Sequence, residues 1–283
     1  MAADTAGPGS ADRGPERPDG LGAHVEVLSP GVSVGFDGGR WYDVSGPDHF
    51  WTRWRLAVAR DVVAAAGVAL DAPMRVLEVG GGIGTLRAQL EEVTAWTVDT
   101  TELDPFALAH VPPGRGRTLH YDVADRRPEF DHAYDAVVLF DVLEHVHDPA
   151  PFLEALAWHL RPGGWLMVNV PALPSAHSRY DDAVGHIRRY SPAGLRAELA
   201  VTGTELLALR AWGLTLVPAL YLRKAALALA GDRCSTDAIV QRGFAPPGRW
   251  ANRGFAALGH LERALPGSSP LGSSLLAVAR AAA

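Results

Sequence analysis

Residues 76–86 read Val-Leu-Glu-Val-Gly-Gly-Gly-Ile-Gly-Thr-Leu, and no other stretch of the chain carries so strong a structural signal. The mostly apolar run from Met74 to Val79 predicts a buried strand, the glycines predict a tight turn, and Thr85 can cap a following helix. Glycine suits such a turn because a residue without Cβ accepts a positive φ and lets backbone N–H groups approach a ligand. The stretch is therefore a candidate nucleotide site.

The spacing of the acidic residue and the glycines separates two kinds of nucleotide site. A dinucleotide-binding fingerprint would place glycines at the positions of Gly80, Gly82 and Thr85, so its third glycine is missing. The chain contains instead the pattern Glu78-x-Gly80-x-Gly82-x-Gly84. A carboxylate two residues before the first glycine repels a pyrophosphate but suits a ligand with an ammonium and a sulfonium. The alternative is a glycine turn that only lets strand and helix pack.

A second group of motifs follows in order. The apolar run from Tyr134 to Phe140 predicts a strand, Asp-Val-Leu-Glu-His follows it at 141–145, and an amphipathic helix ends at Arg-Pro-Gly-Gly, residues 161–164, before another strand at 165–170. With the glycine loop, these motifs resemble the class I S-adenosylmethionine-dependent methyltransferases, in particular the small-molecule branch that includes ubiquinone-pathway O-methyltransferases. The resemblance implies an α/β fold with a doubly wound sheet of seven strands, mainly parallel, whose last strand is antiparallel.

The resemblance also implies S-adenosyl-L-methionine as cofactor and suggests which residues hold it. Glu78, Gly80, Gly82 and Gly84 match the family's first motif. An acidic residue that closes the second strand, predicted over 96–103, accepts hydrogen bonds from both ribose hydroxyls in the family. Glu102 matches that position, with Asp99 as its rival and a helix cap as the structural alternative.

Two further carboxylates are carried over to the cofactor site by resemblance. Asp122 follows the strand predicted over 117–121, where the family places an acidic side chain against the adenine amino group. Asp141 closes the fourth strand, where the family's residues border the methionine part of the cofactor. The competing interpretations are a turn-forming aspartate and a carboxylate that only ties its loop.

A hydroxyl acceptor must lose its proton during methyl transfer, and a neutral histidine is the side chain best suited to take it near pH 7. His186, after the fifth strand, is the first candidate for this base, and His145, after the fourth, is the second. The structural alternative is that Glu144 and His145 tie their loop by hydrogen bonds, while His186 pairs with Asp181 or Asp182.

Composition narrows the partners of this chain of 283 residues. Its net charge of −6 provides no basic field for a nucleic acid, so the expected partner is a small-molecule acceptor. Cys234 is the only cysteine, which excludes intrachain disulfides and multi-thiolate zinc sites and fits a cytoplasmic setting. His145 and His147 lack an evident third ligand, so the sequence predicts no metal.

The chain divides into three parts. Residues 1–23 lack the apolar core of a signal peptide and predict a disordered tail. Residues 24–70 predict an arm, with a short hairpin or ordered segment from His24 to Val44, and a helix that covers the site. That helix begins after a cap at 45–48, and its tryptophans either roof a substrate pocket or join the core.

Residues 71–283 form the expected methyltransferase domain, closed by a strand pair at 205–211 and 273–280, with a helical insertion at about 213–265. The insertion either covers a substrate or forms the surface of a homodimer. The longest apolar stretch of the chain, Leu206 to Ala230, is interrupted by charged residues and Pro218, so no stable membrane insertion is expected.

The sequence therefore predicts methyl transfer to a small molecule, most consistent with O-methylation in secondary or cofactor metabolism. Transfer to nitrogen or carbon is the first alternative. A non-methylating member of the fold, a cyclase or a scaffold, is the second, and a nicotinamide oxidoreductase is the third. Because Glu78, the glycines and Glu102 are all present, a lost cofactor site is disfavoured.

Overall fold

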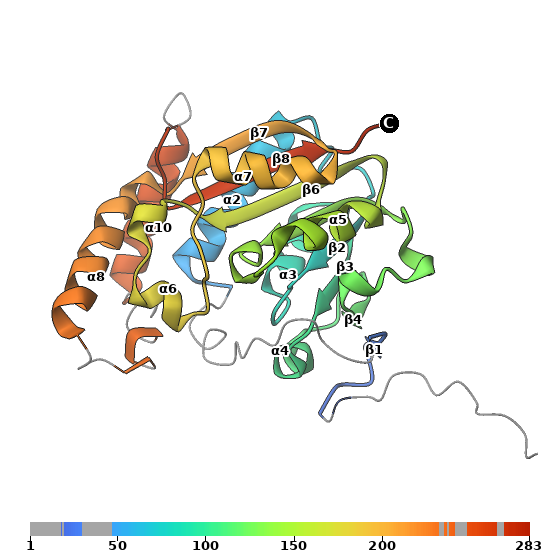
Figure 1. The fold of residues 1–283 in the computed structure, drawn as a ribbon, viewed down its shortest axis with the longest axis horizontal. Helices are drawn as coiled ribbons and strands as arrows, with labels where there is room; N and C mark the ends of the chain where they lie inside the picture. Colours follow the sequence, from blue (N-terminus) through green and yellow to red (C-terminus); the bar gives the residue numbers. More distant parts are fainter. Residues whose placement is uncertain are drawn as a thin grey trace, which may run out of the picture.

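The computed structural model describes residues 18, 20–29, 47–231, 235, 236, 238–240, 248–264 and 269–283. Most of the tail predicted over 1–23, the arm from residue 30 to 44 and Cys234 lie outside the described residues. Within the described part, helices pack on both faces of one central sheet (Figure 1).

The sheet has eight strands in the order β1-β4-β3-β2-β5-β6-β8-β7. All neighbouring pairs are parallel except those of β8, which runs antiparallel to both β6 and β7. This topology confirms the predicted doubly wound, mainly parallel sheet with an antiparallel last strand. The strands are β1 (Val25–Val27), β2 (Arg75–Val79), β3 (Thr97–Glu102), β4 (Thr118–His120), β5 (Tyr134–Phe140), β6 (Leu160–Pro171), β7 (Glu205–Trp212) and β8 (Ser274–Arg280).

The prediction of seven strands was wrong by one, because β1 adds an eighth at the edge of the sheet. Val25 lies opposite Thr118, and the three residues of β1 pair in parallel with β4. The weak alternation from His24 had suggested a hairpin or an ordered arm. A strand of three residues has too little pattern to reveal a partner some 90 positions further along the chain.

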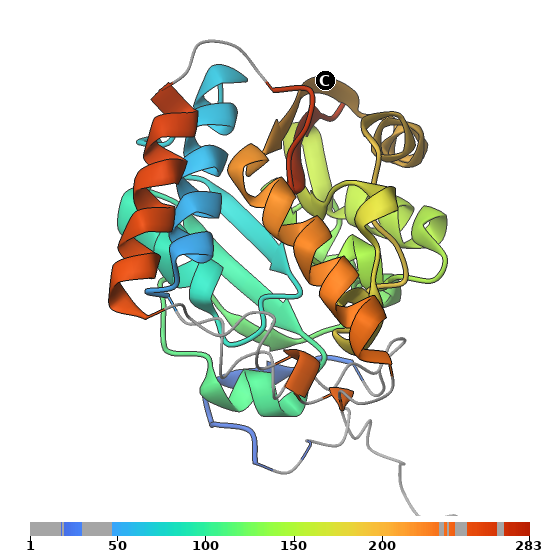
Figure 2. The same cartoon turned by 90° about the vertical axis from the view of Figure 1, so that its left-hand side faces the viewer.

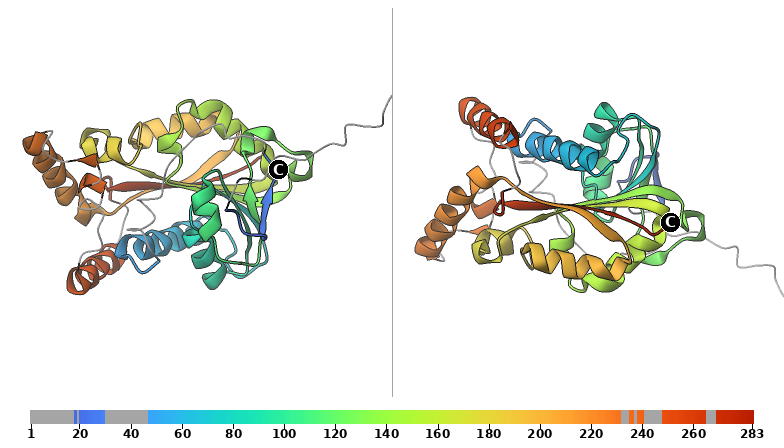
Figure 3. Two further views of the ribbon diagram at one scale, coloured as in Figure 1. Left: turned by 90° about the horizontal axis from the view of Figure 1, so that it is seen from below. Right: turned by 90° about the horizontal axis from the view of Figure 1, so that it is seen from above.

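Helices cover both faces of the sheet (Figure 3), with α5 and α7 on one face and α2 and α3 on the other. Alternation along the central strands supplies both cores. Val76 and Val138 are buried against α2 and α3, whereas Leu77 and Val137 are buried against α5 and α7. The helices are α2 (Phe50–Ala65), α3 (Thr85–Val93), α4 (Pro105–His110), α5 (Pro149–His159), α6 (Arg179–Ala183), α7 (Pro192–Leu199), α8 (Val217–Ala230) and α10 (Arg249–Ala264).

Two helix starts differ by one residue from the sequence expectation. Gly84, at φ 80°, is the N-cap of α3, so Thr85 is the first helical residue rather than the cap. His49, not the residues at 45–48, caps α2, and its side chain accepts a hydrogen bond from the Trp51 N–H. Caps compete locally for the same orphan N–H groups, so the position of a cap is less determined by sequence than the helix itself.

The inserted helix α10 packs along α2, as Figure 2 shows. The rings of Phe50 and Phe255 stack with centroids 4.8 Å apart, and Arg263 forms a bidentate ion pair with Asp61 at 2.6 and 2.8 Å. These contacts hold the insertion against the helix that precedes the glycine loop. In the described part of the chain no helix has the length and apolar character needed to cross a membrane.

Candidate functional site

The carboxyl ends of β2, β3, β4 and β5 open into a cavity of about 220 Å³. In a doubly wound sheet this edge is where ligands bind, because the chain turns to opposite faces on either side of it. Both candidate histidines line the cavity, and so does every predicted cofactor residue except Gly84. Those residues are Glu78, Gly80, Gly82, Glu102, Asp122 and Asp141.

The glycines have two separate reasons for lacking a side chain. Gly80, Gly82 and Gly84 all have a positive φ, of 70°, 55° and 80°. Gly81 does not, but a Cβ there would lie 2.0 Å from Thr100 Oγ1 and 2.9 Å from Glu78 Oε2. Gly81 was not among the predicted site residues, although it stands inside the motif. Gly84 caps α3 and lies outside the cavity wall.

Glu78 is a buried carboxyl in the wall of this cavity, with 2% of its surface exposed. One of its oxygens accepts a hydrogen bond of 2.7 Å from Thr100 Oγ1. Burial raises the pKa of Glu78 to about 7, despite the opposing effects of Thr100 and of Arg55. A cationic group bound beside it would therefore draw off its proton and gain a strong electrostatic partner.

Glu102 ends β3 and is fixed by the backbone around it. Its Oε2 accepts from the Gly82 N–H at 2.8 Å, and its Oε1 accepts from the N–H groups of Leu103 and Asp104 at 2.6 and 3.0 Å. Burial nevertheless raises the pKa of Glu102. The carboxyl group is thus held at the cavity wall, where Oε2, with one hydrogen bond, retains acceptor capacity for a hydroxyl.

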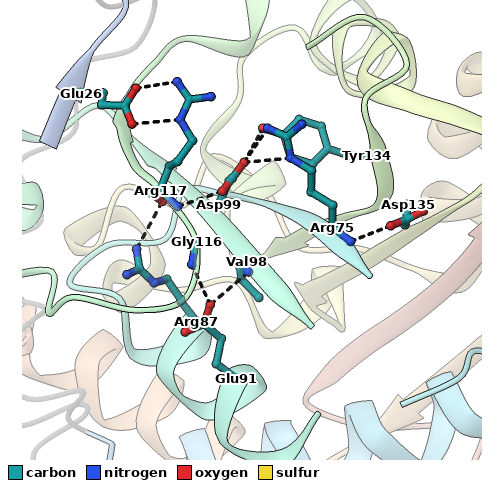
Figure 4. A network of polar contacts seen from close by, with 10 residues as sticks. All are labelled: Glu26, Arg75, Arg87, Glu91, Val98, Asp99, Gly116, Arg117, Tyr134 and Asp135. Atoms are coloured by element: carbon teal, nitrogen blue, oxygen red, sulfur yellow. Dashed lines mark hydrogen bonds and ion pairs between the residues drawn. The ribbon is translucent and has the colours of Figure 1, made fainter. Parts of the chain in front are cut away.

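Asp99, the rival for that role, lies elsewhere, within the polar network of Figure 4. Its side chain accepts hydrogen bonds from Arg75 Nη2 at 3.0 Å, from the Tyr134 hydroxyl at 3.0 Å and from the Arg117 N–H at 2.8 Å. It does not line the cavity. The network ties neighbouring strands together, so the geometry favours Glu102 for the ligand.

The other two predicted carboxylates also have structural partners. Asp122 caps a short 3₁₀ turn by accepting from the Ala124 N–H at 3.0 Å, as its turn-forming alternative implied. Asp141, at φ 59°, accepts from Asn169 Nδ2 at 2.8 Å and from Arg55 Nη1 at 2.5 Å. Both still face the cavity, so the two interpretations of each residue are compatible.

Sequence reasoning missed Arg55, whose side chain is 10% exposed at the ion pair with Asp141. Its guanidinium lies 4.8 Å from the Trp51 ring centroid and 5.5 Å from that of Phe140, and it lines the cavity. The signal was available, because an arginine four residues after Trp51 falls on the apolar stripe of the helix. The predicted tryptophans divide between the two roles: Trp54 is core, and Trp51 lines the cavity.

The two candidate bases lie next to each other. The rings of His145 and His186 meet edge to face with centroids 5.0 Å apart. His145 Nδ1 lies 2.9 Å from the Gly185 carbonyl oxygen, and burial lowers the pKa of His145 to about 4. His186 Nδ1 lies 3.1 Å from Asp181 Oδ1, which identifies Asp181 rather than Asp182 as its partner.

A second cavity, of about 300 Å³, adjoins the first. Trp51, Asp141 and His186 belong to the walls of both. Its apolar side comes largely from the insertion, through Leu216, Ala219, Leu220 and Phe255. The insertion therefore roofs a cavity beside the predicted cofactor site.

Glu144, His145 and His186 offer donor atoms that lie within 4.8 Å of one another, a grouping not foreseen from sequence spacing. Glu144 is fully buried, and burial together with the charge of Asp141 raises its pKa well above the usual range. A cation here would need that carboxyl to ionise, and it would find only one carboxylate in the trio. Metal independence therefore stays our prediction.

Residues 51–209, more than half of the chain, match the family described as a methyltransferase domain. A ubiquinone biosynthesis O-methyltransferase of Xanthomonas oryzae pv. oryzae is 33% identical over 168 residues, which cover 55% of this chain and 66% of that protein. The match thus spans just under two thirds of the relative's length. The chain belongs to the methyltransferase-domain family, which confirms the predicted class of S-adenosylmethionine-dependent methyltransferases.

Solved structures support the same fold. A putative sarcosine dimethylglycine methyltransferase from Galdieria sulphuraria is similar with a TM-score of 0.55 at 15% identity, over 82% of this chain and 86% of that one. Phosphoethanolamine N-methyltransferase 2 of Haemonchus contortus, in complex with S-adenosyl-L-methionine, has a TM-score of 0.51 at 14% identity, over 80% of this chain and 53% of that one. At these identities the similarity concerns the fold alone.

Proposed function

We propose that this protein transfers a methyl group from S-adenosylmethionine to a hydroxyl of a small, largely apolar molecule. The observation that carries the proposal is the pair of adjoining cavities. One is lined by the glycine loop and by carboxyl groups at strand ends, and the other has a largely apolar wall from the insertion opposite polar side chains such as Arg189 and His186. Trp51, Asp141 and His186 lie where the two meet, as a transfer between two bound molecules requires.

The first cavity suits the charges of the cofactor. Glu78 would accept the ammonium, and Arg55 supplies a cation for the carboxylate at the same end. Glu102 would accept the ribose hydroxyls, and Asp122 would accept the adenine amino group. Gly81 leaves the room beside Glu78 that a side chain would fill.

The second cavity suits an acceptor with an aromatic or aliphatic body. Its apolar side chains come from α2, from the start of α8 and from α10, so the insertion would act as a cover over the acceptor. His186 faces this cavity from the loop after α6, close to the shared wall. This position favours a covering role for the insertion over a purely intermolecular one.

The cofactor supplies a methyl group on a sulfonium, so the protein contributes mainly positioning. Holding the acceptor in line can account for about 7–11 kcal/mol of the barrier, and a general base adds about 10²–10⁴-fold. A base matters for a hydroxyl, whose proton must leave, and less for a neutral amine. His186 with its Asp181 partner is the observation that favours oxygen as the acceptor atom.

The test is incubation of the protein with S-adenosylmethionine carrying an isotope-labelled methyl group and a panel of phenols, alcohols and amines, followed by mass spectrometry. We expect labelled phenols or alcohols, and a loss of turnover in His186→Gln without a change in cofactor affinity. If only amines carried the label, the acceptor atom would be nitrogen rather than oxygen. A product of unchanged mass would indicate a cyclase, and full turnover in His186→Gln would remove His186 as the base.

A further inference from the structure

His186 lies between two buried carboxyl groups that come from different elements. On one side, Asp181 Oδ1 in α6 is 3.1 Å from Nδ1, and on the other, Glu144 Oε1 is 3.7 Å from Nε2. The side chains of both acids have no exposed surface, whereas that of His186 is 16% exposed and borders both cavities. The two ring nitrogens therefore have different environments.

Hydrogen bonds to groups other than His186 fix the Asp181 carboxylate in place. Its Oδ2 accepts from the N–H of Ser178 at 2.9 Å and from Ser178 Oγ at 3.2 Å, in a capping box at the start of α6. Its Oδ1 accepts from Arg189 Nε at 2.7 Å, and Arg189 is anchored in turn on the Ala172 carbonyl oxygen at 3.0 Å. The carboxylate has little freedom to turn away from Nδ1.

The surroundings shift the pKa values of the two acids in opposite directions. Burial opposes ionisation of Asp181, but the hydrogen bond from His186 and the charge of Arg189 outweigh it and hold the pKa of Asp181 well below its usual range. Burial raises the pKa of Glu144 instead, and within the described residues neither of its oxygens has a hydrogen-bond partner. The surroundings of Asp181 thus favour its carboxylate form, whereas those of Glu144 oppose ionisation.

We propose that Asp181 is the positioning residue of a buried Asp181–His186 pair, which holds the proton of the neutral imidazole on Nδ1. Nε2 then carries no proton, and it lies on the side of the ring near Glu144, which also lines the second cavity. This inference rests on the proposed function and adds to it the residue that directs the base. A carboxylate on one imidazole nitrogen sets the tautomer and orientation of the ring, and it stabilises the imidazolium that forms during proton transfer.

In the proposed step the proton of the acceptor hydroxyl passes to His186 and then to water. As the acceptor oxygen forms its bond to the methyl group, the O–H bond breaks and His186 Nε2 takes the proton. The electron pair of the sulfur–methyl bond goes to the sulfur. The new imidazolium is matched by the Asp181 carboxylate, and it returns to the neutral form by releasing the proton to water. Burial opposes a second negative charge on Glu144, which would otherwise help to hold the proton on the ring.

Other ionisable groups around His186 belong to several elements. His145 adjoins the ring edge to face, and the charged side chains that act on its acidic partners are Asp141, Arg55, Arg189 and Arg223. His177 Nε2 lies 3.2 Å from the His186 carbonyl oxygen and 3.9 Å from Asp182 Oδ1. Asp182 is largely exposed, and its nearest charged partner is His177, just before α6. Asp182 therefore makes a matched control for Asp181.

The tautomer can be read without mutating Asp181. Nitrogen NMR of the histidine-labelled full chain distinguishes a protonated Nδ1 from a protonated Nε2, and His186→Gln assigns the signal. We expect the neutral ring to carry its proton on Nδ1. A neutral His186 with its proton on Nε2, in the folded protein, would overturn the proposal.

The catalytic consequence is tested with Asp181→Asn against Asp182→Asn. We expect Asp181→Asn to lower kcat at least 10-fold at neutral pH, with cofactor Kd changed less than twofold. We also expect the acidic limb of the kcat profile to move to lower pH, because the charge that stabilises the imidazolium is gone. Asp182→Asn should leave kcat and the profile unchanged.

The outcomes separate this inference from the proposed function. Cofactor binding and methyl transfer by the unmodified protein, together with an unmoved pH profile in a folded Asp181→Asn, would contradict the pairing and leave the methyltransferase assignment intact. Absence of methyl transfer by the unmodified protein would contradict the proposed function. The NMR tautomer still tests the pair if Asp181→Asn does not fold.

Discussion

Glu78 gives the cofactor site a pH dependence whose size follows from its burial. In the free protein its pKa is raised to about 7, and a bound ammonium needs the ionised form. With that pKa, about 3% of the carboxyls are ionised at pH 5.5 and about half at pH 7, so the association constant for a cationic ligand rises about 15-fold over this interval. We expect calorimetric titration with S-adenosylhomocysteine to show this rise.

The variant Glu78→Gln isolates the effect. It keeps the size of the side chain but cannot ionise, so we expect weaker binding at pH 7 and a nearly flat dependence from pH 5.5 to 7. Glu92→Gln is the matched control, because Glu92 is exposed on α3 and should keep the slope of the unmodified protein. A flat profile in the unmodified protein, or an unchanged slope in Glu78→Gln, would refute the reasoning.

The pH dependence of the free energy of unfolding gives a second, independent test of the raised pKa of Glu78. Because the folded-state pKa of Glu78 lies above its ordinary value of 4.5, its contribution to stability is fully present below pH 4.5 and is lost as pH rises through about 7. Relative to the unmodified protein, the free energy of unfolding of Glu78→Gln should therefore increase from pH 5 to pH 8, by up to about 3 kcal/mol. Urea denaturation at several pH values measures the difference.

Three further predictions concern the loop, the strand network and metals. Gly81→Ala should lower the free energy of unfolding by about 1–3 kcal/mol and weaken cofactor binding, since its Cβ would meet Thr100 and Glu78. Gly254→Ala is the control and should do neither, because no atom lies within 4 Å of a Cβ added there. Asp99→Asn should cost about 1–3 kcal/mol of stability, discounted because Arg75 is 41% exposed, and leave cofactor Kd unchanged. A chelator should leave methyl transfer unchanged, and a loss restored by magnesium would assign a metal to the trio formed by Glu144, His145 and His186.

The sequence predicted the central sheet well because its strands are apolar runs with clear ends. Tyr134–Phe140 was placed at its observed bounds, since charged segments flank a mostly apolar run that only Asp135 interrupts. The antiparallel closing pair was also predicted, and β7 and β8 confirm it. The edge strand β1 was missed because three residues carry almost no periodic signal.

Site residues could be predicted where they lie at the end of a strand, and less well where tertiary packing brings them to the cavity. Glu78 and Glu102 could be placed because each lies at or near the end of a strand beside the glycine loop. Arg55 and Gly81 were missed, since the first reaches the cavity from a helix upstream and the second shows its constraint only through Thr100. The second cavity needed α8 and α10 to fold back over the sheet, which spacing along the chain does not reveal.

The most direct test of the account is calorimetric titration of the purified protein with S-adenosylmethionine, S-adenosylhomocysteine and NAD, repeated on Glu102→Ala. We predict that the first two bind, that NAD does not, and that Glu102→Ala loses binding while it stays folded. If neither S-adenosyl compound binds the folded protein, or if Glu102→Ala binds both as well as the unmodified chain does, the assignment of this cavity to the cofactor is contradicted.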